Sequence, residues 1–268
     1  MPLSLKAKLE TWAAALKAYD SENYERALRL FSRIPKSSII LTNMGLIHAA
    51  LGDHEMAVER FIAATVRDPY LAVAYFQCGV SNFLLARHDF AYRDFREALR
   101  NLRGNQNIDY EQIGLKFKLF SAEVLFNQGL CLIKLGQVEK GLADMEAARD
   151  AKATRDHDII ERAIRHRGEG YTVFSVPGGI CYRPSEKKLA NAAHKDYMGE
   201  ARLIAAIDLS DTTTGFAGVE RVNQERKSSG AHIETQEIHH SRSASWDEAI
   251  PYAIPPYDLE RANTAQTR

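Results

Sequence analysis

The sequence predicts an all-α protein built as a solenoid of helical hairpins. The first twenty residues, MPLSLKAKLETWAAALKAYD, carry charges every few positions, which is typical of an amphipathic helix. Two later stretches repeat one pattern of small and aromatic residues at a fixed offset. Beyond them, TRDHDIIERAIRHRGEGY again places its isoleucines on one face of a helix. Pairs of antiparallel helices stacked in series account for these three observations.

The repeat is defined by residues at matching places in two consecutive stretches. Four pairs share a spacing of 34 residues: Gly45 and Gly79, Ala57 and Ala91, Phe61 and Phe95, and Ala64 and Ala98. Small residues allow two antiparallel helices to approach closely, while the aromatic residue and the second alanine fill the contact with the next hairpin. With a proline closing the unit at Pro69, this is the tetratricopeptide (TPR) pattern.

The same pattern fits more weakly on both sides, which predicts four repeats. Upstream it is met by Ala15, Ala27 and Phe31. Downstream it is met by residues that follow their third-repeat counterparts by 50 positions: Gly129, Gly141, Met145 and Ala148. Fifty exceeds the repeat length by 16, so we expect an insertion at about 103–120 between the third and fourth repeats. A solenoid needs no such insertion to stack.

The rest of the chain divides by composition. We expect a TPR domain over 1–170, with a capping helix at about 155–170 that covers the last repeat. The stretch TVFSVPGGICYRPS, within 171–186, is too rich in Gly and Pro for a helix, and we expect it to lie extended on the groove of the repeats. Residues 187–210 return to helix-like composition, and 211–268 read as a disordered tail. Within that tail, WDEAIPYAIPPYDL is either a docking motif or inert.

Composition and motifs exclude several classes of function. The 268-residue chain has 35 basic and 35 acidic residues, a balance that does not favour nucleic acid. No run reaches about 18 apolar residues, so we expect a cytoplasmic protein without direct membrane insertion. No phosphate-binding loop, dinucleotide fingerprint or nucleophile elbow is present. Cys181, in GGICY, would act as a catalytic thiol only with a base supplied by the fold. We therefore expect no enzyme activity, no cofactor and no metal.

Two surfaces remain as candidates for binding. Many TPR proteins clamp a peptide carboxylate in their groove with Lys and Asn at fixed places of the first helices. In this chain the cationic residues are missing, because those places hold Trp12, Leu16, Asn43, Val73 and Gln77. The insertion offers LRGNQNID, in which Arg103 supplies a rigid fork of donors, Asn105 and Gln106 supply amides that donate and accept, and Asp109 supplies an acceptor. Loops of this kind often carry binding on a rigid scaffold. The alternative is a plain Asn/Gly turn between offset helices.

Several stretches closely resemble one family. RDPYLAVAYFQCG, EALRNLRGNQNIDY, GLKFKLFSAEVLFNQG and YRPSEKKLANAAHKDYMGEARLIAAID are similar to the activator subunits of NADPH oxidases, which include neutrophil cytosolic factor two of animals and the fungal Nox regulator NoxR. The resemblance covers about residues 5–220. It includes the interrupted fourth repeat and the KDY-x-G segment in the same order.

The resemblance implies a binding site for a Rac-type small GTPase in its GTP form. Family members bind it through the insertion and the adjacent loops, and leave the groove to their own extended segment. By matching position, the GTPase-binding residues would be Ser38, Asp68, Tyr70, Arg103, Asn105, Asn107 and Asp109. Tyr70 stands where a histidine is usual, and Asn107 where a leucine is usual. Asp68 also has an ordinary interpretation as the residue before the closing proline.

The resemblance also implies a segment that activates the oxidase. In the family this stretch acts on the membrane-bound catalytic subunit, and here it would include Tyr197, Met198, Gly199, Leu203 and Ile204. The alternative is that RLIAAIDL only packs on the capping helix. The resulting hypothesis is a non-catalytic cytoplasmic regulator of superoxide production. The GTP-loaded GTPase would recruit it to the membrane, and other oxidase adaptor proteins are further candidate partners. The rival hypothesis is a TPR adaptor for peptides or chaperones without a GTPase.

Overall fold

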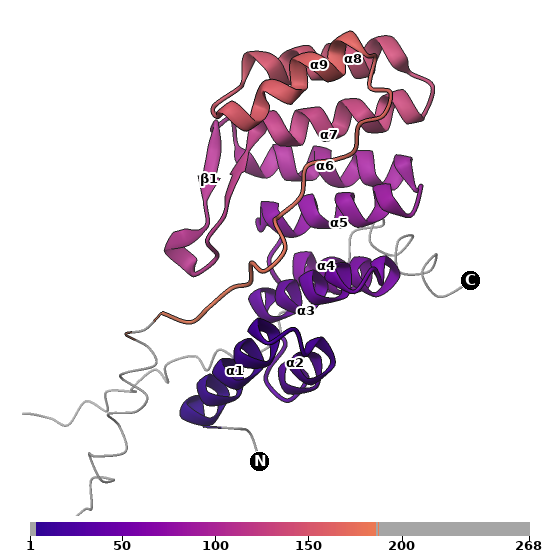
Figure 1. Ribbon diagram of the computed structural model, residues 1–268. Helices are drawn as coiled ribbons and strands as arrows, with labels where there is room; N and C mark the ends of the chain where they lie inside the picture. The colour runs from indigo at the N-terminus through magenta and orange to yellow at the C-terminus, as the bar shows by residue number, and fades with distance from the viewer. Residues whose placement is uncertain (1–3, 186, 188–268) are drawn as a thin grey trace, which may run out of the picture. The chain divides into compact units, whose positions relative to one another are not determined.

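The computed structural model describes residues 4–185 and residue 187 of the chain. Four antiparallel helix pairs follow one another: α1 (Leu5–Asp20) with α2 (Tyr24–Phe31), α3 (Ser38–Ala50) with α4 (His54–Arg67), α5 (Ala72–Leu84) with α6 (His88–Leu102), and α7 (Ser121–Lys134) with α8 (Val138–Asp150). Each pair packs on the next, as Figure 1 shows. This arrangement confirms the predicted all-α TPR solenoid. No helix in the described part of the chain is long and apolar enough to cross a bilayer.

Each hairpin turns through one residue in the left-handed region. The four residues at this place have φ between 57° and 79°: Glu22, Gly52, Ala86 and Gly136. The amide of the next residue then bonds to a carbonyl five positions back, as when Asp53 N–H donates to His48 O at 2.9 Å. This bond closes the last turn of the first helix and sends the chain back antiparallel. The turns therefore share one conformation although only two of them use glycine.

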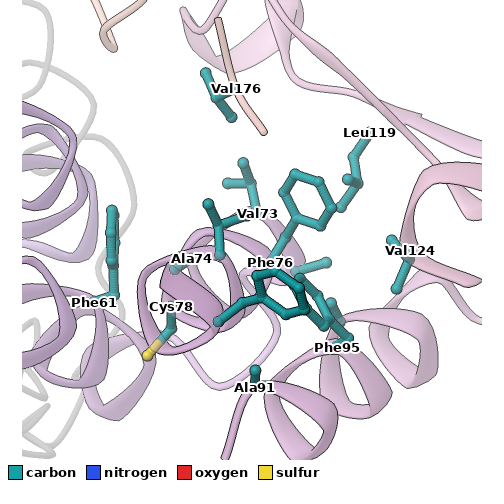
Figure 2. Packing of buried hydrophobic residues seen from close by; sticks show 14 of the residues in the cluster. Phe61, Val73, Ala74, Phe76, Cys78, Ala91, Phe95, Leu119, Val124 and Val176 are labelled. Carbon is teal, nitrogen blue, oxygen red and sulfur yellow. The ribbon is translucent and has the colours of Figure 1, made fainter. Parts of the chain in front are cut away.

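The crossing of the two helices in a pair depends on a glycine facing a buried ring. A Cβ atom at Gly45 would lie 2.6 Å from Cε1 of Phe61, and one at Gly79 would lie 2.8 Å from Cε1 of Phe95. Both rings are fully buried. In Figure 2, Phe95 meets Phe76 of α5 edge-on, with their centroids 5.8 Å apart. Glycine is thus required at this place of the repeat, because a side chain would overlap the ring on the partner helix.

The insertion differs from the polar loop that the sequence favoured, because it forms a β-hairpin. Strands β1 (Asn107–Asp109) and β2 (Lys118–Phe120) pair antiparallel, with the 3₁₀ turn η1 (Glu111–Ile113) between them. Ile108 lies opposite Leu119, which is fully buried. Beside that pair, Lys118 Nζ lies 3.1 Å from Asp109 Oδ2. The Ile108–Leu119 pair therefore packs the hairpin against the core, and the Asp109–Lys118 pair faces outward.

The capping helix is shorter than expected. A 3₁₀ turn, η2 (Arg155–Asp158), precedes α9 (Ile159–Arg165), which packs against α8. The helix ends because Arg167 has a φ of 52°, and the Gly168 amide donates to Ala163 O at 2.8 Å.

Residues 171–185, named the strap here, have neither helix nor strand and run across the solenoid. Side-chain amides hold their main chain. Asn127 donates to Phe174 O at 2.9 Å and accepts from Phe174 N–H at 2.8 Å. Asn43 does the same for Tyr182, at 2.9 and 2.7 Å.

The middle of the strap is held on α5. Val176 N–H donates to Gln77 Oε1 at 3.3 Å. The Val176 side chain lies above Val73 in the same buried cluster (Figure 2). The strap therefore crosses α7, α5 and α3 in the reverse of chain order.

One ionisable group joins the hairpin, the cap and the strap. Glu123, in the first turn of α7, accepts a bond from Phe120 N–H at 3.3 Å, and its other oxygen lies 3.7 Å from His157 Nε2. The His157 ring contacts the rings of Phe120 and Phe174. Burial, followed by repulsion from Asp156, raises the pKa of Glu123 to about 7. Burial lowers the pKa of His157.

Phe61→Ala should lower the free energy of unfolding by about 3–5 kcal/mol, because it leaves a cavity against Gly45. Leu51, which is 49% exposed at the α3–α4 turn, offers the control. Leu51→Ala should change that free energy by about 0.5 kcal/mol or less. Urea unfolding followed by circular dichroism measures both. Equal effects of the two substitutions would contradict the proposed role of the glycine–ring contact.

Glu123→Gln should make stability less dependent on pH. The pKa of Glu123 is about 7 in the folded chain, above its ordinary value of 4.5, so the folded state holds the extra proton between these values. Stability that depends on this proton is lost as pH rises through that window. The variant should therefore gain stability relative to the native chain from pH 5 to pH 8, by up to about 3 kcal/mol.

Urea unfolding of both proteins at the two pH values measures this difference. His157 remains in both, so its opposite contribution, lost as pH falls through its ordinary value, largely cancels. A difference that stays constant across the range would show that the Glu123 carboxyl titrates normally.

Candidate functional site

The seven residues expected to bind a GTPase lie along one edge of the solenoid. Ser38 begins α3, Asp68 and Tyr70 lie between α4 and α5, and the remaining four follow α6 in the stretch 103–109. Since successive helices run in opposite directions, the ends of α2, α4 and α6 and the starts of α3, α5 and α7 fall on this edge. We call it the inter-repeat edge. Every connection from one helix pair to the next lies on this edge.

A contact between Arg103 and Tyr70 joins the α6–α7 connection to the α4–α5 connection. Cζ of Arg103 lies 5.2 Å from the centroid of the Tyr70 ring, within the range of a cation–π contact. Arg103 ends α6 with a φ of 54°, so its backbone conformation is fixed by the helix end. Tyr70 is 68% exposed, and its amide donates to Asp68 Oδ1 at 3.0 Å. The pair presents a guanidinium over an aromatic ring to the solvent.

The remaining polar groups of the insertion are fixed by local bonds. The Asn105 side chain donates to Leu102 O at 2.9 Å and so caps the end of α6. Asp109 accepts a bond from Glu111 N–H at 2.9 Å and pairs with Lys118. The Glu111 amide and then Lys118 hold the pKa of Asp109 below its ordinary value, so its carboxylate stays charged. Asn107 lies half-buried opposite Phe120 in the strand pair.

Ser38 is at the same edge but stands apart from this group. Its neighbour Ser37 caps α3, accepting a bond from Ile40 N–H at 3.4 Å. The Ser38 carbonyl accepts from the Thr42 hydroxyl at 2.8 Å. Within the described residues, its side chain makes no hydrogen bond to the other six. The structure therefore brings together Asp68, Tyr70 and Arg103 by contact, and Ser38 only by its place on the edge.

Sequence reasoning missed the residue that anchors the hairpin. The Tyr110 hydroxyl accepts a bond from Val73 N–H at 3.0 Å, in the first turn of α5. Burial raises the pKa of Tyr110 to about 12. Leu115 and Leu119 are fully buried beside it. Apolar residues at 110, 115, 117 and 119 of an otherwise polar insertion are the signal that could have revealed this contact.

The activation segment and the cysteines remain to be located. The activation segment, with Tyr197, Met198, Gly199, Leu203 and Ile204, lies outside the described residues. Cys181 is buried, and its burial raises the pKa of its thiol to about 12, so the thiol stays protonated at neutral pH. Cys78 and Cys131 are also buried and unbridged.

Comparison with known proteins places this chain beside oxidase activators. No family model matches it. It is 34% identical over 219 residues to neutrophil cytosol factor 2 of Mus musculus, which covers 80% of this chain and 42% of that protein. It is 33% identical over 208 residues to NADPH oxidase activator 1 of Rattus norvegicus, covering 76% of this chain and 46% of that protein. The chain thus spans less than half the length of either relative.

Solved structures with a similar fold share little sequence identity with this chain. The MamA RS-1 ArsTM double mutant overlaps 74% of this chain and 98% of its own, with a TM-score of 0.49 and 17% identity. Because that score is below 0.5, the repeat assignment rests on the helix pairs described above. The matched residues make up 80% and 76% of this chain, and over them the chain is similar to proteins named as NADPH oxidase activators.

Proposed function

We propose that this chain is a non-catalytic regulatory subunit that binds a GTP-loaded Rac-type small GTPase and activates a membrane NADPH oxidase. The observation that carries the proposal is the group on the inter-repeat edge, where Arg103 lies over Tyr70 and an anchored hairpin follows Arg103 directly in the chain. The names of the relatives, neutrophil cytosol factor 2 and NADPH oxidase activator 1, support the regulatory role.

The chemistry of this edge suits a protein partner. Arginine and tyrosine are the residue types that most often dominate protein–protein interfaces. Arg103 offers a planar fork of donors, and the ionised Asp109 offers an acceptor nearby in the same stretch. Local bonds already fix Asn105 and Asp109, so binding loses little side-chain freedom. A rigid, polar edge of this kind discriminates by geometry between two states of a partner loop.

Dependence on nucleotide then comes from the partner. A small GTPase orders its switch loops only while the γ-phosphate is bound. The GTPase is the membrane-anchored member of the pair, so docking raises the local concentration of the bound chain at the oxidase. A weak second contact with the oxidase catalytic subunit is then sufficient. We assign that contact to residues 197–209, and we expect the cytoplasm as the resting location.

A second candidate function is a TPR adaptor that holds a foreign peptide. The repeat architecture favours it in general, because the first helices of such repeats line a peptide groove. Here, however, Asn43 and Asn127 already bind the main chain of the strap with both their donor and their acceptor. A peptide at that place would have to displace the strap. The edge is therefore the better candidate.

Arg103→Glu should raise the Kd for the GTP-loaded GTPase at least about tenfold, a loss of about 1.4 kcal/mol or more, so that a pull-down no longer captures it. Arg167→Glu is the matched control. Arg167 also ends a helix at positive φ and precedes a glycine, but it pairs with Glu139 at the start of α8, on the opposite edge. Pull-down and calorimetry with GTP-loaded and GDP-loaded Rac measure the effect. Binding that ignores the nucleotide, or equal loss in both variants, would refute the docking site.

Leu203→Ala should leave binding to the GTPase intact and lower superoxide output severalfold in a reconstituted oxidase, because it truncates an apolar side chain of the activation segment. Leu135, which is 41% exposed at the α7–α8 turn, provides the control substitution Leu135→Ala. Cytochrome c reduction measures output at saturating GTPase. Unchanged output in the Leu203 variant would show that the segment is misassigned.

A further inference from the structure

The tip of the β-hairpin touches the strap through main-chain atoms. Arg183 N–H donates to Gly114 O at 2.8 Å. Gly114 has a φ of 96°, and a Cβ atom there would lie 2.1 Å from Arg183 O. Such a separation is far inside van der Waals contact, and the obstacle is a carbonyl group that a rotamer change cannot move. Only glycine therefore fits between the hairpin and the strap.

The strap is itself fixed at this point to the first two hairpins. The Arg183 guanidinium donates to both oxygens of Asp20, at the end of α1, at 3.0 and 2.5 Å. The bond from Arg183 is the main cause that lowers the pKa of Asp20. One residue earlier, Asn43 of α3 binds both main-chain groups of Tyr182. The residue that meets the hairpin tip is thus tied to α1 and α3.

This arrangement bears on how the docking edge is assembled. Ser38 and Asp68 belong to the helix pair α3–α4 and its exit, whereas Arg103–Asp109 belong to the insertion after α6. Tyr110, which directly follows β1, anchors the insertion on α5. The contact between Gly114 and Arg183 adds a second anchor, which joins the hairpin tip through the strap to α1 and α3. The angle of the insertion relative to Ser38 and Asp68 therefore depends on the strap.

We infer that Arg183 is a positioning residue for the GTPase site, which clamps the docking hairpin to the first two repeats. This inference rests on the proposed function and names a residue outside the site. Because coupling between two places is reciprocal, a partner bound at Arg103–Asp109 also stabilises the contact between Gly114 and Arg183. Binding on the inter-repeat edge therefore stabilises the strap at Arg183, although no atom of the partner contacts the strap.

Gly114→Ala in the full chain tests the clamp, with Gly136→Ala as its matched control. Both glycines have positive φ, 96° and 79°, but a Cβ at Gly136 meets nothing within 4 Å. Both substitutions thus carry a similar backbone cost, and only one collides with the strap. Gly114→Ala should raise the Kd for GTP-loaded Rac tenfold or more, and Gly136→Ala should change it less than twofold. Equal affinities in the two variants would overturn the inference.

A second readout separates positioning from general destabilisation. Adding GTP-loaded Rac to the native chain should slow hydrogen exchange of the Arg183 amide at least threefold, although that amide lies outside the site. Unchanged exchange in a saturated complex would overturn the coupling. Failure of the native chain to bind GTP-loaded Rac would instead refute the proposed function, so the two failures are distinguishable.

A charge exchange covers the case in which Gly114→Ala does not fold. Asp20→Lys places a cation against Arg183 and should raise the Kd threefold or more. Combining Asp20→Arg with Arg183→Asp restores the attraction in reverse and should return the Kd to within twofold of the native value. A single variant that binds normally, or a double variant that binds no better than the single, would count against the clamp.

Discussion

The solenoid depends on a steric constraint repeated in three of its four helix pairs, where a glycine of the first helix lies against the partner helix. Gly45 meets Phe61 in this way and Gly79 meets Phe95. In the α7–α8 pair the approach is closer still, because a Cβ at Gly129 would lie 2.6 Å from the carbonyl oxygen of Gly141. This distance sets how the pairs stack, and the stacking aligns the turns that form the inter-repeat edge.

That constraint explains why the fold class could be predicted and the insertion could not. A requirement that recurs every 34 residues leaves a visible pattern in the sequence. Strands of three residues, as in Asn107–Asp109, are too short to show an alternation. The pairings of the strap are harder still, because Asn43 and Tyr182 are separated by 139 residues. Polar residues of the site could be named from a family resemblance, and the apolar residues of the insertion pointed to a buried contact, but the partners of Tyr110 and Arg183 required the three-dimensional contacts.

The strap is bound through a chemistry that differs from a carboxylate clamp. An amide side chain both donates and accepts, so Asn43 and Asn127 each satisfy an N–H and a C=O of one strap residue. Such bonds recognise the main chain and place few demands on side-chain identity. Sequence selectivity along the strap is left to the buried positions, Val176, Cys181 and Tyr182. The groove thus recognises the main chain of an extended segment, which suits the strap as its permanent ligand.

A solenoid of stacked repeats is ordinarily quasi-one-dimensional: each unit contacts only its neighbours, and units at the ends can open independently. The strap changes that topology, because it bonds to all four helix pairs and returns from the last repeat to the first. Opening any one pair then breaks bonds that are shared with distant pairs. The chain should therefore melt as one cooperative unit, and its folding should be slowed by contacts of long sequence separation that a bare repeat array does not need.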